Sequence, residues 1–160
     1  MVKLEPVSLR PWQPWAAVGG FALLLHFMWE LFQAPFFEGM AAAPHWSVVL
    51  RCSRDSAGDV VIAWLAYAVA ARWAGRRSWL AEPGRTPFRI YMIVGLAVTV
   101  LLEWVNVYGW HTWAYAEKMP VLLGIGLTPL LQWLLLPPIT LWLARRHLDL
   151  GTGRSSPRPA

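Results

Sequence analysis

Ionisable side chains interrupt stretches of sequence that are otherwise as apolar as membrane-spanning helices. Glu30 lies in the first such stretch, Glu103 in the third, and His26 precedes Glu30 by four residues. A charged side chain inside a bilayer is costly, so such residues face the protein interior and by default indicate a functional site. We therefore take Glu30 and Glu103 as the candidate catalytic, proton-exchanging groups, with His26 as their partner.

Helical spacing places further polar groups beside these three. Residues three or four positions apart share one face of a helix. The first stripe is His26, Glu30 and Gln33, and the second is Glu103, Asn106 and Trp110. The candidate substrate-binding residues are Gln33, Asp59, Asn106, Trp110, Trp113, Tyr115 and Gln132. We assign no metal ligand, and the sequence leaves the cofactor open.

The depth of each residue indicates which groups can meet. At 1.5 Å per residue, Glu30 and Glu103 both lie about 10 Å below the outer ends of their helices, on one level. His26 and Gln132 lie about 16 to 18 Å down, and Asp59 lies nearer the outer rim. The sequence thus predicts a funnel open to the extracytoplasmic side, acidic at its mouth and ending in a His and a Gln.

The two glutamates should interact across this funnel. Two ionised carboxylates at one depth repel each other, so one must hold a proton or a cation or His26 must compensate. We predict that the carboxyls of Glu30 and Glu103 meet directly or through one water, His26 or an ion. We also predict that at least one has a raised pKa.

Three chemistries are compatible with these groups. A His and a Glu one turn apart with a facing Glu could move a proton in an isomerase, hydratase or cyclase that acts on a lipid-soluble substrate. The same groups could bind a divalent metal, although His plus carboxylates is a weak signal without a tighter motif. They could also form a proton or cation relay in a small transporter. A non-catalytic accessory subunit, in which polar residues only join helices, is the remaining alternative.

The elements that position these residues are four apolar runs. The chain of 160 residues is 57% hydrophobic and only 14% charged, a composition typical of membrane proteins. Runs long enough to cross the bilayer lie at residues 15–37, 57–74, 88–110 and 120–144. The predicted fold is all-α, a polytopic four-helix transmembrane bundle. Its fourth helix, starting at Pro120, should be broken, because the run contains Gly124, Gly126, Pro129, Pro137 and Pro138.

The remaining segments complete the prediction. Residues 38–56 form an extracytoplasmic segment, with Ser53 or Asp55 as the N-cap of the second span. Residues 1–14 form a cytoplasmic N-terminal segment, residues 15–145 the transmembrane domain and residues 146–160 a disordered cytoplasmic tail. The alanines at 41–43 could pass for a signal-peptidase site, but the polar stripe and the length of the first run favour a retained span. The single Cys52 excludes an intramolecular disulfide.

The basic residues set the expected orientation. Eleven of the 14 Lys and Arg residues lie in the termini and the middle loop, against three in the outer segments. The positive-inside rule then places both termini in the cytoplasm. A bacterial inner membrane is the location that the resemblance described below implies. The net charge of +5 does not indicate nucleic acid, because no separate soluble domain exists to carry a basic patch. The expected partners are the lipid bilayer and a lipid-like small molecule, and the oligomeric state is left open.

The same residues carry a resemblance. His26-Phe-Met-Trp29-Glu30-Leu-Phe-Gln33, Asp55, Asp59, Glu103, Trp113-Ala-Tyr115 and Gly126-Leu-Thr-Pro129-Leu-Leu-Gln132 resemble small four-span bacterial integral membrane proteins of uncharacterised function. The resemblance covers residues 15 to 140 and implies no activity. A local likeness is to the emopamil-binding-protein-like isomerases, which use a His and a Glu four apart on one membrane helix for proton transfer to a sterol double bond. Only His26 and Glu30 match that pattern, and that family has five spans.

The orientation can be tested with a reporter that is active only outside the cytoplasm. Fused to Ala160 the reporter should be silent, whereas inserted near Ala42 it should be active, because an even number of spans returns the chain to the cytoplasm. The reverse pattern would move the polar site to the cytoplasmic side.

Overall fold

Four long helices make up most of the structure, a computed structural model that describes residues 10–75, 79–81 and 83–148. They are α1 (Gln13–Gln33), α2 (His45–Trp73), α3 (Arg85–Trp104) and α4 (Leu127–His147). A two-stranded antiparallel hairpin, β1 (Val121–Leu122) and β2 (Ile125–Gly126), precedes α4. The expectation of a mostly helical chain is confirmed.

Three segments are long and apolar enough to cross a membrane. They are Gln13–Phe36, Arg85–Gly109 and Leu127–His147. This finding indicates a multi-pass membrane protein. Helix α2 is not among them, and its first half carries the charged residues Arg51, Arg54, Asp55 and Asp59.

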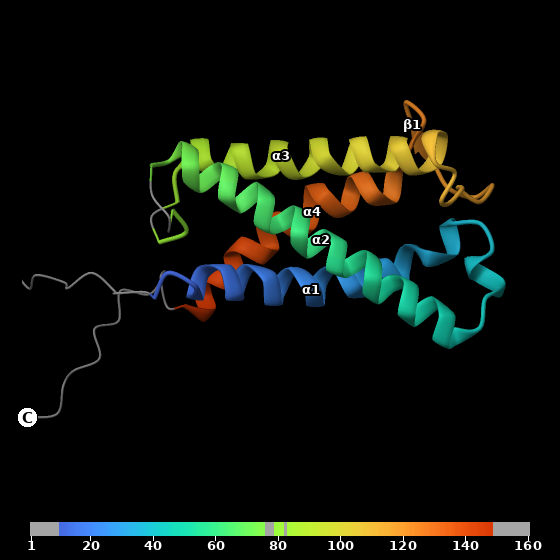
Figure 1. Ribbon diagram of the computed structural model, residues 1–160, viewed down its shortest axis with the longest axis horizontal. Coiled ribbons are helices and arrows are strands. Elements are labelled where there is room, and N and C mark those ends of the chain that lie inside the picture. The colour runs from blue at the N-terminus through green and yellow to red at the C-terminus, as the bar shows by residue number, and fades with distance from the viewer. Residues whose placement is uncertain (1–9, 76–78, 82, 149–160) are drawn as a thin grey trace, which may run out of the picture.

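The helices run alternately up and down. Helix α1 packs mainly against α2 and α4, and α3 packs against the same two helices. Figure 1 shows α1 and α3 on opposite sides of the molecule, with α2 and α4 crossing each other between them. Glu30 of α1 and Glu103 of α3 therefore belong to helices that face each other across the bundle.

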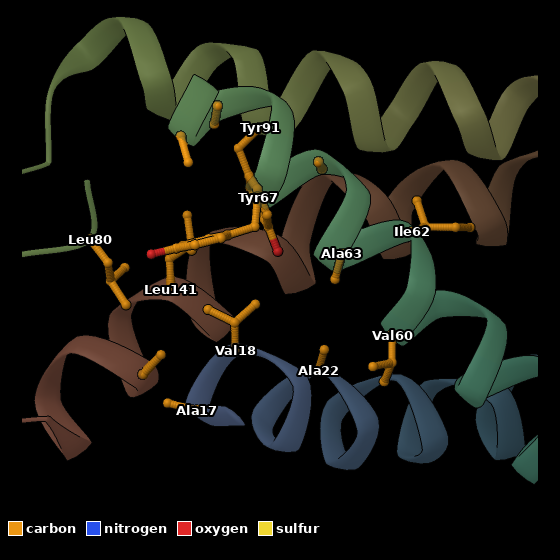
Figure 2. Close-up of a cluster of buried hydrophobic side chains, with 14 of the residues drawn as sticks. Ala17, Val18, Ala22, Val60, Ile62, Ala63, Tyr67, Leu80, Tyr91 and Leu141 are labelled. Atoms are coloured by element: carbon orange, nitrogen blue, oxygen red, sulfur yellow. The ribbon is translucent and has the colours of Figure 1, made fainter. Parts of the chain in front are cut away.

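The apolar core fills the half of the bundle that contains the start of α1 and the end of α2. Small residues allow the helices to approach closely there, as Figure 2 shows for Ala17, Ala22 and Ala63. The Tyr67 ring stacks on Trp79 with centroids 5.4 Å apart. These side chains fill the space between α1 and α2 in this half of the bundle.

The start of α2 corrects the sequence prediction. The helix begins at His45 with Pro44 as its N-cap, so residues 45–56 belong to the helix and not to an outer segment. Neither Ser53 nor Asp55 is the N-cap: the Ser53 hydroxyl donates to the Val49 carbonyl within the helix (2.8 Å). Asp59 therefore lies about 21 Å along α2, well inside the bundle.

The ends of the other helices also differ from the prediction. Helix α1 begins at Gln13 and α4 extends to His147, while residues 1–9 and 149–160 lie outside the described residues. Residues 121–126 form the hairpin, so α4 begins at Leu127 and not at Pro120. The hairpin turn places Leu123 and Gly124 at positive φ, 51° and 83°, which a helix cannot accommodate. The expected break in α4 is not confirmed, because one helix contains both Pro137 and Pro138.

Close packing between α3 and α4 can be tested at Gly95. A Cβ added at this position would overlap the Trp133 ring, which is fully buried. We expect Gly95→Ala to destabilise the bundle by about 1–3 kcal/mol, because the overpacked ring must move. The measurement is the thermal unfolding midpoint in detergent.

Gly20 offers the matched control. It lies in α1, where an added Cβ meets nothing within 4 Å. Gly20→Ala should leave the midpoint unchanged or raise it, because alanine favours a helix by up to about 1 kcal/mol over glycine. An unchanged midpoint for Gly95→Ala would contradict the packing described.

Candidate functional site

A cavity of about 290 Å³ opens in the half of the bundle away from the apolar core. All four helices contribute to its wall, and so do the α1–α2 connection and the segment after α3. Its polar lining consists of Glu30, Gln33, Arg51, Arg54, Asp55, Asp59, Thr99, Glu103, Asn106 and Gln132. Phe37, Met40, Ile62, Leu102 and Pro129 give it an apolar part. The cavity is thus both acidic and partly apolar.

The Gln132 amide lies at the centre of a buried hydrogen-bond network. Its Nε2 donates to Glu30 Oε1 (3.1 Å) and Asp59 Oδ2 (3.1 Å), and lies 2.9 Å from His26 Nδ1. Its Oε1 accepts from Gln33 Nε2 (3.2 Å). One side chain of α4 is therefore bonded to three residues of α1 and one of α2.

Trp29 fixes the direction of this network. Its indole Nε1 can only donate, and it donates to Gln33 Oε1 (3.2 Å) and to the Thr128 carbonyl (3.2 Å). Gln33 must then direct its NH₂ group inward, to Glu30 Oε1 (2.8 Å) and to Gln132. Both glutamine NH₂ groups consequently point at the Glu30 carboxyl.

Asp59 joins α2 to the same network through two further contacts. Trp133 Nε1 donates to its Oδ1 (3.2 Å), and His26 Nδ1 lies 3.1 Å from its Oδ2. The Gln132 NH₂ has two hydrogens for three acceptors, so the His26 and Asp59 contact is satisfied only when one of those two groups supplies a proton. His26 meets this need in the tautomer that carries its hydrogen on Nδ1, so the network favours that tautomer.

A second acidic group lies on the opposite wall. The Tyr115 hydroxyl donates to Glu103 Oε2 over a short distance of 2.5 Å. Tyr115 is anchored by a β-bridge between its backbone and Phe37, which ties the α3–β1 connection to the α1–α2 connection. Burial and the neighbouring Glu103 carboxylate raise the pKa of Tyr115, so its hydroxyl remains a donor at neutral pH.

Arginines lie at the more exposed part of the cavity. Arg51 Nε is 3.8 Å from Asp55 Oδ2, and Arg54 Nε is 3.5 Å from Asp55 Oδ1. Asp55 is therefore compensated. Glu30 and Glu103, by contrast, receive their hydrogen bonds from neutral amide and hydroxyl donors.

The structure brings most of the predicted site residues together. Glu30, Gln33, Asp59, Glu103, Asn106, Trp113 and Gln132 line the cavity, His26 contacts Gln132, and Tyr115 contacts Glu103. The predicted depth placed Asp59 near the outer rim, and this prediction is wrong, because α2 begins earlier than predicted. It lies at the level of His26 and Gln132, in contact with both.

Trp110 does not belong to the site. It is 73% exposed and does not line the cavity. The π-helical turn η3 (Val105–Gly109) explains this, because the Trp110 N–H donates to the Val105 carbonyl, five residues back (2.7 Å). The wider turn rotates Trp110 away from the face that Glu103 and Asn106 share.

Glu30 and Glu103 face the same cavity, but no hydrogen bond joins them within the described part of the chain. We predicted that their carboxyls interact through a water, His26 or an ion, and that at least one of them has a raised pKa. Both statements stay predictions. In the same part of the chain, no group of three or more His, Cys, Asp or Glu side chains is arranged to hold a metal ion.

Three residues of the site were not singled out from the sequence. Trp29 and Trp133 donate to the network, and each is a neighbour of a predicted site residue in the chain. Thr99 is buried on the cavity wall, and its hydroxyl has no hydrogen-bond partner among the described residues. Thr99 precedes Glu103 by four residues, so the helical spacing could have placed it on the same face as Glu103.

Compared with protein-family models, curated proteins and solved structures, the chain has no match. The interpretation of the site therefore depends on its own geometry.

The structural role of the network can be tested at Gln132. Gln132→Leu removes the amide but keeps a side chain of similar size, so Glu30, Asp59 and Gln33 each lose a partner. We expect a loss of about 2–5 kcal/mol in the free energy of unfolding, because each buried group left unpaired costs about 1–3 kcal/mol. Leu134→Ala, on the exposed face of α4, is the control and should have a much smaller effect. Equal effects would contradict the central position of Gln132.

Proposed function

We propose that this chain is a four-span membrane protein whose intramembrane carboxylate and histidine site binds an amphipathic or lipid-like small molecule and exchanges protons with it. Both termini would be cytoplasmic, in a bacterial inner membrane, and the cavity would face the extracytoplasmic side. Helix α2 would be the fourth span. Its 29 residues measure about 43 Å, enough to cross the bilayer at an angle.

The observation that carries this proposal is the cavity itself. Residues that only join helices pack against one another and leave no space between them. Here Glu30, Asp59 and Glu103, from three different helices, share the wall of a 290 Å³ cavity. A space of this size beside buried carboxyls supports a binding site, because pockets for small molecules combine an apolar lining with a few placed polar groups.

The two acidic units suit acid/base chemistry. On one wall, His26, Asp59, Gln132 and Glu30 form a buried hydrogen-bond network. On the other, Tyr115 donates to Glu103. A substrate between these walls would lie between one group that gives a proton and another that accepts one, the arrangement that isomerases, hydratases and cyclases need. Trp113 and Tyr115 would border the entrance.

The lining supports a substrate with a hydrocarbon part. Phe37, Ile62 and Leu102 offer apolar surface, and Gln33, Thr99 and Asn106 offer polar groups that could orient a head group. The cavity therefore suits a molecule that is neither fully polar nor fully apolar.

Transport of protons or cations is the second candidate. The excess of acidic residues favours it: the described residues in this half of the molecule include six Asp and Glu but only three Lys and Arg. Acidic residues in helices that cross membranes commonly form ion and proton pathways. In this version Glu30, Asp59 and Glu103 would bind the ion in turn.

The decisive experiment combines ligand identification with neutralising variants. The full chain is purified in mild detergent, and bound molecules are identified by native mass spectrometry and elemental analysis. Glu30→Gln and Glu103→Gln should lose the bound lipid-like molecule while their unfolding midpoints stay equal to that of the wild type or rise, since poised functional carboxyls often cost stability. Glu117→Gln, at an exposed acid, is the control and should keep the ligand.

Each other outcome has a distinct meaning. Proton flux in liposomes that Glu103→Gln abolishes, with nothing bound, would replace the binding proposal with transport. A fall in the midpoint of both variants, with neither ligand nor flux in the wild type, would leave only a helix-joining role.

A further inference from the structure

A second cavity lies at the opposite end of the bundle from the acidic site. It measures about 350 Å³ and lies between the start of α3, the end of α4 and the connection that precedes α3. Leu141 and Trp142 of α4 and Phe88 of α3 form apolar walls, and Arg145 and Arg146 are also part of the lining. It is thus a groove with a hydrocarbon-like surface and two guanidinium groups.

The charged residues that the structure describes at this end of the bundle are all basic. Six basic residues are described at this end of the bundle, namely Arg10, Arg72, Arg85, Arg89, Arg145 and Arg146, and all the described acidic residues lie in the other half. Arg145 and Arg146 form no salt bridge with any residue that the structure describes. Arg146 lies 6.0 Å from the centre of the Trp142 ring, which holds its guanidinium near the groove. The described residues therefore leave both guanidinium groups without an acidic partner.

The start of α3 adds a further attraction for an anion. Pro83 and Phe88 line the groove on either side of this helix start, whose N-cap Gly84 supplies no side-chain hydrogen bond. The first N–H groups of a helix carry partial positive charge and bind phosphate when no side chain caps them. Guanidinium groups also match the geometry of phosphate oxygens and bind them in pairs of hydrogen bonds.

We propose that this groove binds an anionic phospholipid, with its phosphate at Arg145 and Arg146 and the start of an acyl chain along Phe88, Leu141 and Trp142. The apolar walls favour a lipid over free phosphate. Phe88 and Trp142 are 37% and 59% exposed, on helices long and apolar enough to lie in lipid, so an acyl chain can leave the groove into the bilayer. Basic pockets between membrane helices recognise lipid head groups by this combination of charge and apolar contact.

The test measures lipid binding to the full chain in mild detergent by native mass spectrometry, with added phosphatidylglycerol or phosphatidylcholine. The wild type should bind phosphatidylglycerol more tightly. The double variant R145Q/R146Q should weaken phosphatidylglycerol binding roughly twenty-five-fold, about five-fold for each arginine, and weaken phosphatidylcholine binding less, because the choline cation offsets its phosphate charge.

Two further variants keep the result decisive. R10Q/R72Q removes the same charge from exposed positions at the same end of the bundle that do not line the groove, and should bind phosphatidylglycerol as the wild type does. R145K/R146K keeps the charge and should retain most of the preference for phosphatidylglycerol, even if the glutamine variant proves unstable. Equal weakening by R10Q/R72Q and R145Q/R146Q would overturn the proposal, and so would an unchanged preference for phosphatidylglycerol in R145Q/R146Q. Inorganic phosphate at the same concentration as the lipid should not displace it. If it does, the proposal is overturned, because the acyl chain then contributes nothing to binding.

Discussion

Hydrogen bonding at membrane depth is the constraint on which this structure depends, because polar groups away from water must find partners within the protein. The Gln132 amide meets that constraint for three helices, through Glu30 and His26 of α1 and Asp59 of α2. Asp59 in turn holds the indole of Trp133, and the Trp133 ring fits against α3 only because residue 95 is a glycine. The polar network and the packing of α3 are thus one connected arrangement.

The two halves of the bundle differ because their side chains differ in size and polarity. Alanines such as Ala22 and Ala63 bring α1 and α2 together around an apolar core, as Figure 2 shows. Toward the other end these positions are taken by Glu30 and Asp59, which are larger and need partners. Because α2 and α4 cross between α1 and α3 (Figure 1), they cannot fill both ends of the bundle equally. One of the resulting cavities lies beside these acidic side chains.

The sequence predicted the polar stripes well, because spacings of three and four residues fix which side chains share a face of a regular helix. His26, Glu30 and Gln33 do share a buried face, as do Glu103 and Asn106. The prediction failed where local structure departs from that rule. The π-helical turn displaced Trp110, and positive φ angles at Leu123 and Gly124 produced a hairpin in place of a helical turn. The charged residues at positions 51–55 led to the wrong prediction that α2 begins after them. In the structure they belong to the helix, where Arg51 and Arg54 lie close to Asp55.

The number of hydrogens in the network connects its structure to its chemistry. The Gln132 NH₂ has two hydrogens for three acceptors, and the adjacent His26 Nδ1 and Asp59 Oδ2 lie 3.1 Å apart. With a hydrogen on His26 Nδ1, which neutral imidazole carries in one of its two tautomers, that pair is satisfied and Gln132 can turn its hydrogens toward the carboxyls. Without it, Gln132 must donate to His26 and give up one carboxyl. A molecule in the cavity that favours one tautomer of His26 would therefore change the hydrogen bonds among α1, α2 and α4 together, so the position of this hydrogen and the contacts between these helices are coupled.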